Sequence, residues 1–89
     1  MYTDKKDVTG ELDLHGLTVE EGLDVLDKYL DKAYLYGISP VRLVHGHGTG
    51  KLRKAIREFL KEHPHVARFN PASPSHGGDG ATTVYLEII

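Results

Sequence analysis

Cysteine is absent from the 89 residues of this chain, and no long apolar run interrupts its polar sequence. Without cysteine, the chain can form neither a disulfide framework nor a thiolate metal site, and this composition fits a cytoplasmic protein. No apolar stretch approaches the roughly 18–20 residues of a membrane helix, and residues 1–6 lack the apolar core of a signal peptide. We therefore expect one small cytoplasmic domain with a single modest core and no membrane contact.

Charge of both signs is present, but it is unevenly distributed along the sequence. Seven of the eleven basic residues lie within residues 40–68, together with only two of the thirteen acidic residues. This segment therefore carries a balance of +5, whereas the remainder carries −7 and the total is −2. Such sorting gives a nearly neutral protein one positive face, which suits an anionic partner. The alternative is that these charged side chains only face water on helix surfaces and bind no partner.

Two segments show the one-sided apolar stripe that is typical of helices. Thr18 and Glu21 form a capping box, and the helix that begins there is expected to end at Gly37. The second helix begins at Gly50 or one residue earlier. It must stop near His63, because the residue before a proline disfavours helical geometry.

Alternating apolar residues predict strands over 11–15, 40–45, 66–69 and 82–89, with residues 70–81 as a loop. In the last strand, the inward side chains are expected to be Val84, Leu86 and Ile88. The order β-α-β-α-β-β indicates an α/β fold, a two-layer sandwich with a mixed four-stranded sheet and one largely uncovered sheet face. We interpret residues 1–10 as a polar linker or disordered terminus and residues 11–89 as the domain.

A glycine-rich turn joins the second strand to the second helix, and residues 45–53 read HGHGTGKLR. Its glycines let the backbone approach an anion closely, and the helix start offers unpaired N–H groups. The spacing matches neither the Walker loop nor the Rossmann fingerprint. Because a basic helix follows, we expect the anion to be a phosphate. The alternative is a tight connection that needs its glycines only for backbone dihedral angles.

Asp13 and His15 lie two residues apart on a strand, so their side chains project the same way. A carboxylate beside an imidazole fixes its tautomer and raises its basicity, which suits general acid–base catalysis. The alternative is an ordinary surface pair at a strand end. His45 ends the next strand, and ligands gather beyond the carboxyl ends of parallel strands. We therefore expect His15 and His45 to reach the same rim, next to the glycine turn.

The other four histidines give weaker signals. His47 lies in the turn and either contacts a phosphate or faces solvent, and His76 precedes a loop tip that folds either toward the site or away from it. His63 and His65 flank a proline and are expected to be solvated. No helical histidine pair or cysteine pair anchors a zinc site, so we predict no bound structural metal. The alternative is a cofactor, Mg²⁺ or Mn²⁺, held loosely near Asp13.

Three motifs of this chain resemble those of the small MutS-related (Smr) domain: LDLHG at Leu12–Gly16, HGHGTGKLR at His45–Arg53 and GGDGATTVYL at Gly77–Leu86. They occur in the family's order, and the match covers nearly all of residues 11–89. This family occurs at the C-terminus of the second bacterial MutS paralogue, which suppresses recombination, and in stand-alone proteins. The resemblance implies a fold like the C-terminal domain of translation initiation factor three. It also implies nicking endonuclease activity on DNA, or on RNA in some relatives.

The resemblance places the family's acid and histidine on Asp13 and His15, and its glycine motif begins at His45. The family often has a basic residue where this chain has His47, so we expect binding here to depend more on pH. By hypothesis, His15, oriented by Asp13, activates a water or a ribose hydroxyl, and His45 stabilises or protonates the leaving oxygen. The scissile phosphate is expected to lie against the amides of Gly46–Lys51. The residues expected to bind nucleic acid are Gly46, His47, Gly48, Thr49, Gly50, Lys51, Arg53, Lys54, Arg57 and Lys61.

The expected function is nicking of nucleic acid, selective for structure rather than sequence, because no element resembles a base-reading helix. Branched DNA or recombination intermediates are the expected substrates. The alternatives are a non-catalytic module that binds DNA or ribosomal RNA, an RNA endonuclease in ribosome rescue, and a unit that binds an acidic protein. We expect a monomeric domain, either standing alone or excised from a parent with a MutS-like ATPase region.

Overall fold

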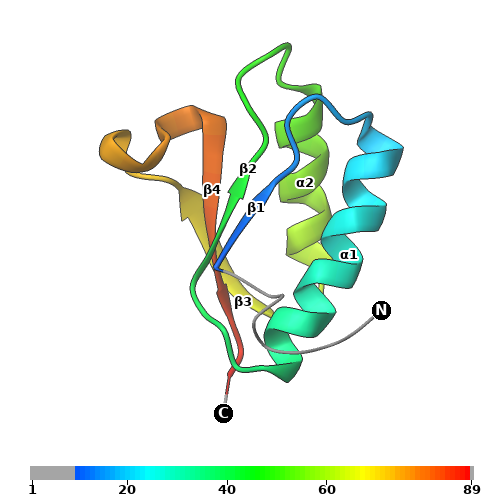
Figure 1. The fold of residues 1–89 in the computed structure, drawn as a ribbon, viewed down its shortest axis with the longest axis vertical. Coiled ribbons are helices and arrows are strands. Elements are labelled where there is room, and N and C mark those ends of the chain that lie inside the picture. Colours follow the sequence, from blue (N-terminus) through cyan, green and yellow to red (C-terminus); the bar gives the residue numbers. More distant parts are fainter. Residues whose placement is uncertain (1–9, 89) are drawn as a thin grey trace.

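The structure is a computed structural model that describes residues 10–88, apart from the side chain of His76. The expected N-terminal linker therefore lies, except for Gly10, outside the described residues. These residues form β1 (Glu11–Asp13), α1 (Val19–Leu35), β2 (Val41–Val44), α2 (Lys51–Glu62), β3 (Val66–Pro71) and β4 (Ala81–Leu86), with the short 3₁₀ turns η2 (Pro74–His76) and η3 (Gly78–Gly80) before β4 (Figure 1).

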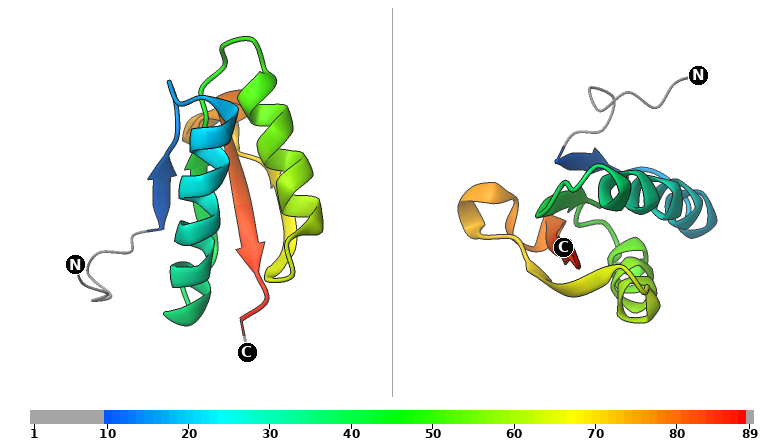
Figure 2. Two further views of the ribbon diagram at one scale, coloured as in Figure 1. Left: turned by 90° about the vertical axis from the view of Figure 1, so that its right-hand side faces the viewer. Right: turned by 90° about the horizontal axis from the view of Figure 1, so that it is seen from below.

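The strands form one mixed sheet in the order β1-β2-β4-β3. β1 and β2 are parallel, with Asp13 opposite Val44, and β4 is antiparallel to both of its neighbours. Both helices lie on the same side of the sheet, which leaves its other face uncovered (Figure 2). The predicted α/β two-layer sandwich with a mixed four-stranded sheet is confirmed.

Helix α1 begins at the predicted capping box. The Thr18 hydroxyl accepts from the Glu21 amide at 3.1 Å, and the Glu21 carboxylate accepts from the Thr18 amide at 3.0 Å. Two N–H groups that the helix itself cannot satisfy are thereby paired. The helix ends at Leu35, and Gly37 provides the predicted stop: its φ angle is +68°, its amide donates to the Tyr34 carbonyl, and the Ile38 amide donates to the Ala33 carbonyl. The buried residues of the helix are Gly22, Leu26, Leu30 and Ala33.

Helix α2 starts without a side-chain cap, because its N-cap is Gly50. The φ angle of +86° at this residue lies in the left-handed region, which favours glycine. Ile56 and Leu60 are buried, and the outer face carries the predicted exposed charges: Lys51, Lys54, Glu58 and Lys61. The two helices approach closely near their N-terminal ends, since a Cβ atom at Gly22 would lie 2.9 Å from Leu52 Cδ1.

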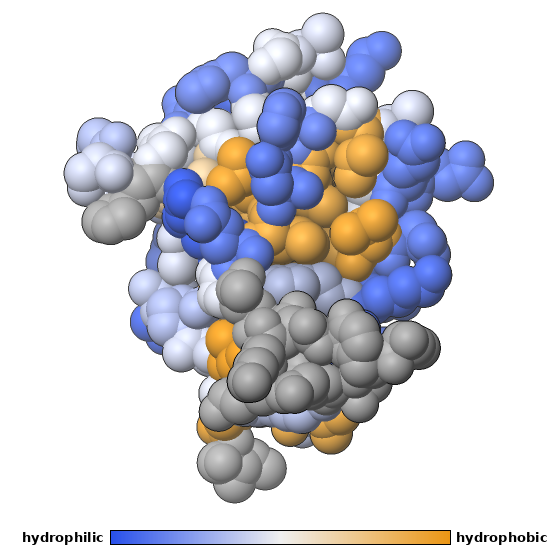
Figure 3. Space-filling view, in the orientation of Figure 1, coloured by the Kyte–Doolittle hydropathy of each residue, from blue (hydrophilic) through white to orange (hydrophobic). Residues whose placement is uncertain are grey.

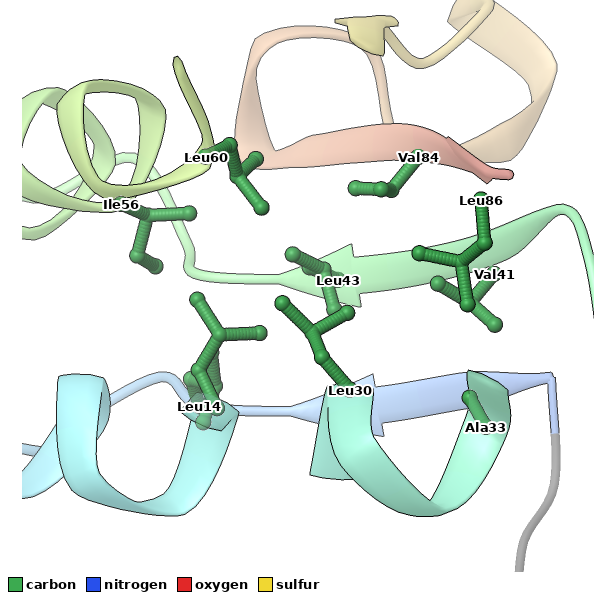
Figure 4. Close-up of a cluster of buried hydrophobic side chains, with 10 residues drawn as sticks. Leu14, Leu30, Ala33, Val41, Leu43, Ile56, Leu60, Val84 and Leu86 are labelled. Atoms are coloured by element: carbon green, nitrogen blue, oxygen red, sulfur yellow. The ribbon is translucent and has the colours of Figure 1, made fainter. Parts of the chain in front are cut away.

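The core lies between the helices and the sheet (Figure 4). Its fully buried side chains include Leu26, Leu30, Leu43, Ile56, Leu60 and Val84. Burying each such side chain contributes roughly 1.5–3 kcal/mol. In the view of Figure 1, the surface is mostly hydrophilic around an apolar area over β1 and the adjoining part of α1 (Figure 3). None of the described helices has the length and apolar character needed to span a membrane.

Three strand boundaries differ from the prediction by two or more residues. β1 stops at Asp13: the Leu14 amide still donates to the Val44 carbonyl at 2.6 Å, but the Leu14 carbonyl accepts from the Leu17 amide, so the chain turns away from the sheet. β3 continues to Pro71, since its last residues still pair with β4. β4 ends at Leu86, and the prediction that Ile88 faces the core is wrong. Ile88 is 39% exposed, because its amide turns back to the Leu86 carbonyl.

Candidate nucleic-acid interface

The candidate site lies at the carboxyl ends of the parallel strands β1 and β2. His15 follows β1, and the glycine turn, defined here as residues 45–50, follows β2. The two segments touch, because a Cβ atom at Gly46 would lie 3.4 Å from His15 Cβ. Parallel strands of neighbouring position end at one edge of a sheet, so the topology places His15 beside the turn.

Asp13 and His15 form an exposed hydrogen-bonded pair. Asp13 Oδ1 lies 2.6 Å from His15 Nδ1 and 3.1 Å from the His15 amide nitrogen. The hydrogen bond from the His15 ring, with a smaller contribution from the amide, holds the pKa of Asp13 below its ordinary value of 3.8. Because a carboxylate only accepts, Nδ1 carries the ring proton, and Nε2 is left as a proton acceptor. A general base requires this arrangement.

His45 lies at the glycine turn, as expected, but it is buried, with only 5% of the residue exposed. Its Nδ1 lies 3.0 Å from the Gly46 carbonyl oxygen, and its Nε2 lies 2.8 Å from Thr82 Oγ1. Since a carbonyl only accepts, Nδ1 donates to Gly46, and Nε2 of the neutral ring accepts from the Thr82 hydroxyl. Burial lowers the pKa of His45 from its ordinary value of 6.5, the Gly46 carbonyl opposes this in part, and the charges of Arg57 and Arg53 lower it further.

Both ring nitrogens of His45 are therefore occupied inside the protein. A group that protonates a leaving oxygen needs a ring nitrogen that can reach the substrate, and both nitrogens of this ring are engaged by protein groups. The ring is buried because its partners, Gly46 and Thr82, hold it inward.

Thr82 also links His45 to helix α2. Arg57 Nε lies 3.4 Å from Thr82 Oγ1, so the threonine accepts from the arginine and donates to the histidine. Arg57 Nη2 is buried and has no hydrogen-bond partner among the described residues. Arg57 is thus turned partly inward, unlike the exposed lysines of α2. The prediction did not include Thr82, whose one sequence signal is that it shares the inward strand parity of Val84.

The glycine turn is tied to the loop before β4. The amides of His45 and Gly46 donate to the Gly80 carbonyl oxygen at 3.0 and 2.9 Å. The His47 ring lies over Gly80, where a Cβ atom would meet His47 Cε1 at 2.8 Å. The loop at 77–80 therefore folds toward the site. The Gly46 amide is already engaged, which corrects the expectation that it binds a phosphate.

The rest of the turn retains unpaired donors. Within residues 10–88, no intramolecular acceptor is found for the amides of His47, Gly48, Thr49, Leu52 and Arg53. The Lys51 amide makes only a long contact, 3.4 Å, with Thr49 Oγ1. These donors line a pocket of about 290 Å³, the turn pocket, whose opposite wall is residues 16–19. Such donors suit an anion.

Next to the turn, helix α2 borders a shallow basic groove of about 530 Å³. Its lining residues are Thr49, Gly50, Arg53, Lys54, Arg57, Glu58 and Lys61. Positive charge concentrated in a groove attracts phosphates of any sequence. The structure therefore joins the turn and the predicted basic residues into one continuous surface.

Comparison with known proteins identifies the family. The family model of the Smr domain matches residues 12–87. This chain belongs to the Smr domain family. Endonuclease MutS2 of Thermomicrobium roseum is 54% identical over 81 residues, which are 91% of this chain and 10% of that protein. Endonuclease MutS2 of Carboxydothermus hydrogenoformans is 48% identical over 85 residues, 96% of this chain and 11% of that protein. The chain thus spans about a tenth of these relatives.

Solved structures share the fold of this Smr domain. The Smr domain of Thermus thermophilus MutS2 has a TM-score of 0.85 and 49% identity, with 86% of this chain and 96% of that chain covered. YdaL, a stand-alone small MutS-related protein from Escherichia coli, has a TM-score of 0.81 and 30% identity, with 86% and 63% covered. The family predicted from three motifs is confirmed.

At the other end of its helices, the Smr domain packs two histidines that we expected to be solvated. The His63 side chain is only 6% exposed, and the His65 ring stacks on Tyr34 with ring centroids 3.6 Å apart. These rings fill the junction between α1, the end of α2 and the start of β3. The expectation is wrong because the turn at Pro64 folds both rings back onto the helices.

Asp27, Asp31 and His63 bring potential metal ligands within 4.8 Å of one another. His63 Nδ1 accepts from the His65 amide at 3.1 Å, so Nε2 carries the ring proton and lies 3.7 Å from Asp27. A metal at Nε2 would have to displace that proton, so this hydrogen bond opposes metal binding. Within residues 10–88, no such group of ligands includes Asp13.

Proposed function

We propose that this Smr domain is an endonuclease that nicks nucleic acid by general base catalysis. The Asp13–His15 pair carries the proposal, because Asp13 fixes the ring proton on Nδ1 and Nε2 has no partner among the described residues. This acceptor belongs to a residue that touches a turn rich in unpaired amides. The name of the relatives, Endonuclease MutS2, supports phosphodiester cleavage as the reaction.

In this mechanism, the scissile phosphate lies against the amides from His47 to Arg53. Lys51 and Arg53 neutralise its charge, and donors that are already in place stabilise the charge that develops in the transition state. His15 accepts the proton of a water or a ribose hydroxyl as that oxygen attacks phosphorus. The ester bond from phosphorus to the leaving oxygen breaks, and the leaving oxygen keeps its electron pair and takes a proton from solvent.

His45 is a positioning residue in this proposal. Its ring binds the Gly46 carbonyl, while the Gly80 carbonyl binds the amides of His45 and Gly46. The entrance to the turn is therefore fixed before substrate arrives, which lowers the reorganisation needed during the reaction. This role replaces the expected protonation of the leaving oxygen.

We propose branched or recombination-intermediate DNA as the substrate, recognised through its phosphates by the basic groove. RNA is the competing substrate, because a neighbouring 2′-hydroxyl supplies a nucleophile that His15 can deprotonate. Mg²⁺ or Mn²⁺ near Asp13 remains an alternative source of positive charge for DNA cleavage. The same basic groove also favours a second candidate, a module that binds nucleic acid without cutting it.

The test uses the purified domain with supercoiled plasmid and, separately, structured RNA, each with and without a chelator. We expect plasmid nicking, and a fall of about 100-fold or more for His15→Ala, since general acid–base catalysis contributes roughly 10²–10⁴-fold. Affinity should be unchanged in His15→Ala. Lys51→Ala is the matched binding variant and should lose affinity.

The outcomes separate the candidates. Cleavage no greater than in a mock preparation, with binding that still depends on Lys51, identifies a binding module and refutes the enzyme. Chelator-insensitive cleavage of RNA alone identifies attack by the 2′-hydroxyl. Chelator-sensitive plasmid nicking identifies a cation near Asp13.

A further inference from the structure

The turn pocket has one wall that phosphate binding does not explain. Residues 16–19 form this wall, and its apolar side chains are Leu17 and Val19, with Leu52 contributed by α2. Val19 remains 37% exposed although it is apolar and begins a helix with a buried face. Pockets for small organic groups combine such apolar walls with a few convergent polar groups.

The two walls of the turn pocket differ in chemistry. The turn side offers unpaired amides and the cations Lys51 and Arg53, whereas the side of α1 offers methyl groups. A phosphate is held by the first wall and gains nothing from the second, because an anion is better solvated by water than by methyl groups. A ligand that fits both walls joins an anionic group to an apolar body. A nucleotide has this composition.

The charges around the turn pocket set the orientation of such a ligand. The first turn of α1 contains Glu20 and Glu21, whereas the first turn of α2 contains no acid. A phosphate is therefore repelled from the α1 side and attracted to the α2 side. The close approach of Leu52 to Gly22 brings the N-terminal ends of the two helices together. The apolar wall of the turn pocket therefore lies next to the amides of the glycine turn.

We propose that the turn pocket receives one unpaired nucleobase, next to the phosphate that the glycine turn holds. This inference rests on the proposed function and adds its substrate class. A paired base can enter the pocket only by losing its pairing and stacking, whereas a base at a flap, gap, bulge or junction has already lost them. The apolar wall thus selects nucleic acid by structure without reading its sequence.

Two single-stranded oligonucleotides of equal length test the inference. One contains thymidine throughout, and the other contains abasic residues in which hydrogen replaces each base. Both carry the same phosphates, so contacts to phosphate alone would bind them equally. We expect the unaltered domain to bind the thymidine oligonucleotide about tenfold more tightly, within the range measured for the loss of one base contact.

Val19→Ser removes the most exposed part of the apolar wall, and Val25→Ser is its matched control. Val25 lies on the same helix and is 39% exposed, but it does not line the turn pocket. In Val19→Ser, we expect the thymidine preference to fall to about twofold with unchanged affinity for the abasic oligonucleotide. Val25→Ser should keep the full preference. Val19→Thr, which nearly keeps the shape of valine, should reduce the preference even if Val19→Ser lowers the thermal midpoint.

Each result has a definite meaning. Equal affinity of the unaltered domain for both oligonucleotides, with plasmid nicking intact, overturns the base pocket and leaves the proposed function standing. An equal loss of preference in Val19→Ser and Val25→Ser overturns it as well. Failure to bind either oligonucleotide, together with failure to cut plasmid or RNA, overturns the proposed function and the base pocket together.

Discussion

At the scale of single residues, His15 and His45 have the same tautomer but different roles. Both rings carry a proton on Nδ1, because a carboxylate faces one and a carbonyl faces the other. Nε2 of His15 has no partner among residues 10–88, whereas Nε2 of His45 is bound by Thr82 in the interior. The first ring can therefore exchange protons with a substrate, and the second holds the backbone in place.

The buried state of His45 makes stability depend on pH. Its pKa in the folded protein lies below the ordinary 6.5, mainly through burial. As the pH falls through about 6.5, His45 binds a proton in the unfolded chain but stays neutral in the folded protein. The free energy of unfolding therefore decreases. In His45→Gln, we expect a weaker dependence of the urea midpoint on pH between about pH 8 and pH 5.

His47→Gln is the control for this measurement, because it removes an exposed histidine from the same turn. It should keep the pH dependence of the unaltered protein. The charges of Arg53 and Arg57 remain in both variants, and each lowers the pKa of His45 more than His47 does. A His45→Gln protein whose midpoint falls with acid as steeply as the unaltered protein would show that this ring does not control the effect.

The sequence predicted the Asp13–His15 pair but not the burial of His45, and the reason is the range of the interactions. Asp13 and His15 are only two residues apart, so their contact is local, and the strand parity expected from the sequence placed them together although β1 itself ends at Asp13. His45 is held by Thr82, 37 residues away, and its amide is held by Gly80. No local pattern specifies contacts between a turn and a strand so distant in the chain.

At the scale of elements, Thr82 on β4 joins the turn after β2 to helix α2. Thr82→Val keeps the side-chain shape and suits a strand, but it removes the partner of His45 Nε2 and of Arg57 Nε. Since buried polar groups without partners are costly, we expect the free energy of unfolding to fall by about 1–3 kcal/mol. Urea unfolding monitored by circular dichroism measures the change.

Thr83→Val is the matched control for Thr82→Val. It makes the same chemical change one position along β4, at a half-buried site beside the uncovered face of the sheet. We expect its stability to stay within about 0.5 kcal/mol of the unaltered protein. Equal losses in the two variants would mean that strand β4, and not the link between turn and helix, accounts for the effect.

Helix ends were predicted better than strand ends, again for a physical reason. The capping box of Thr18 and Glu21 and the proline after His63 act within a few residues, so the sequence contains the whole signal. Strand ends depend on pairing partners elsewhere. Pro71 stays in β3 because β4 continues beside it, and Ile88 leaves the core because β4 has already ended.

At the scale of the whole molecule, the distribution of charge matters more than its sum. The chain has a net charge of −2, yet helix α2 gathers exposed Lys51, Lys54 and Lys61 next to the unpaired amides of the turn. Helix α1, in contrast, carries five of the thirteen acidic residues: Glu20, Glu21, Asp24, Asp27 and Asp31. A nucleic acid therefore approaches the α2 side of a protein whose total charge alone would repel it.

This distribution predicts a steep dependence of binding on salt. Each neutralised phosphate releases counterions, so about three contacts from α2 and the turn give a slope of about −3 for the logarithm of affinity against the logarithm of salt concentration. Lys54→Gln and Lys61→Gln should each reduce the magnitude of the slope by about one.

Lys28→Gln is the control, because Lys28 pairs with Asp24 on α1 at 3.3 Å and should leave the slope unchanged. Fluorescence anisotropy with a short duplex at several salt concentrations measures these slopes. A slope near zero, or an equal effect of Lys28→Gln, would contradict the placement of the phosphates along α2, because counterion release counts only the charges that contact them.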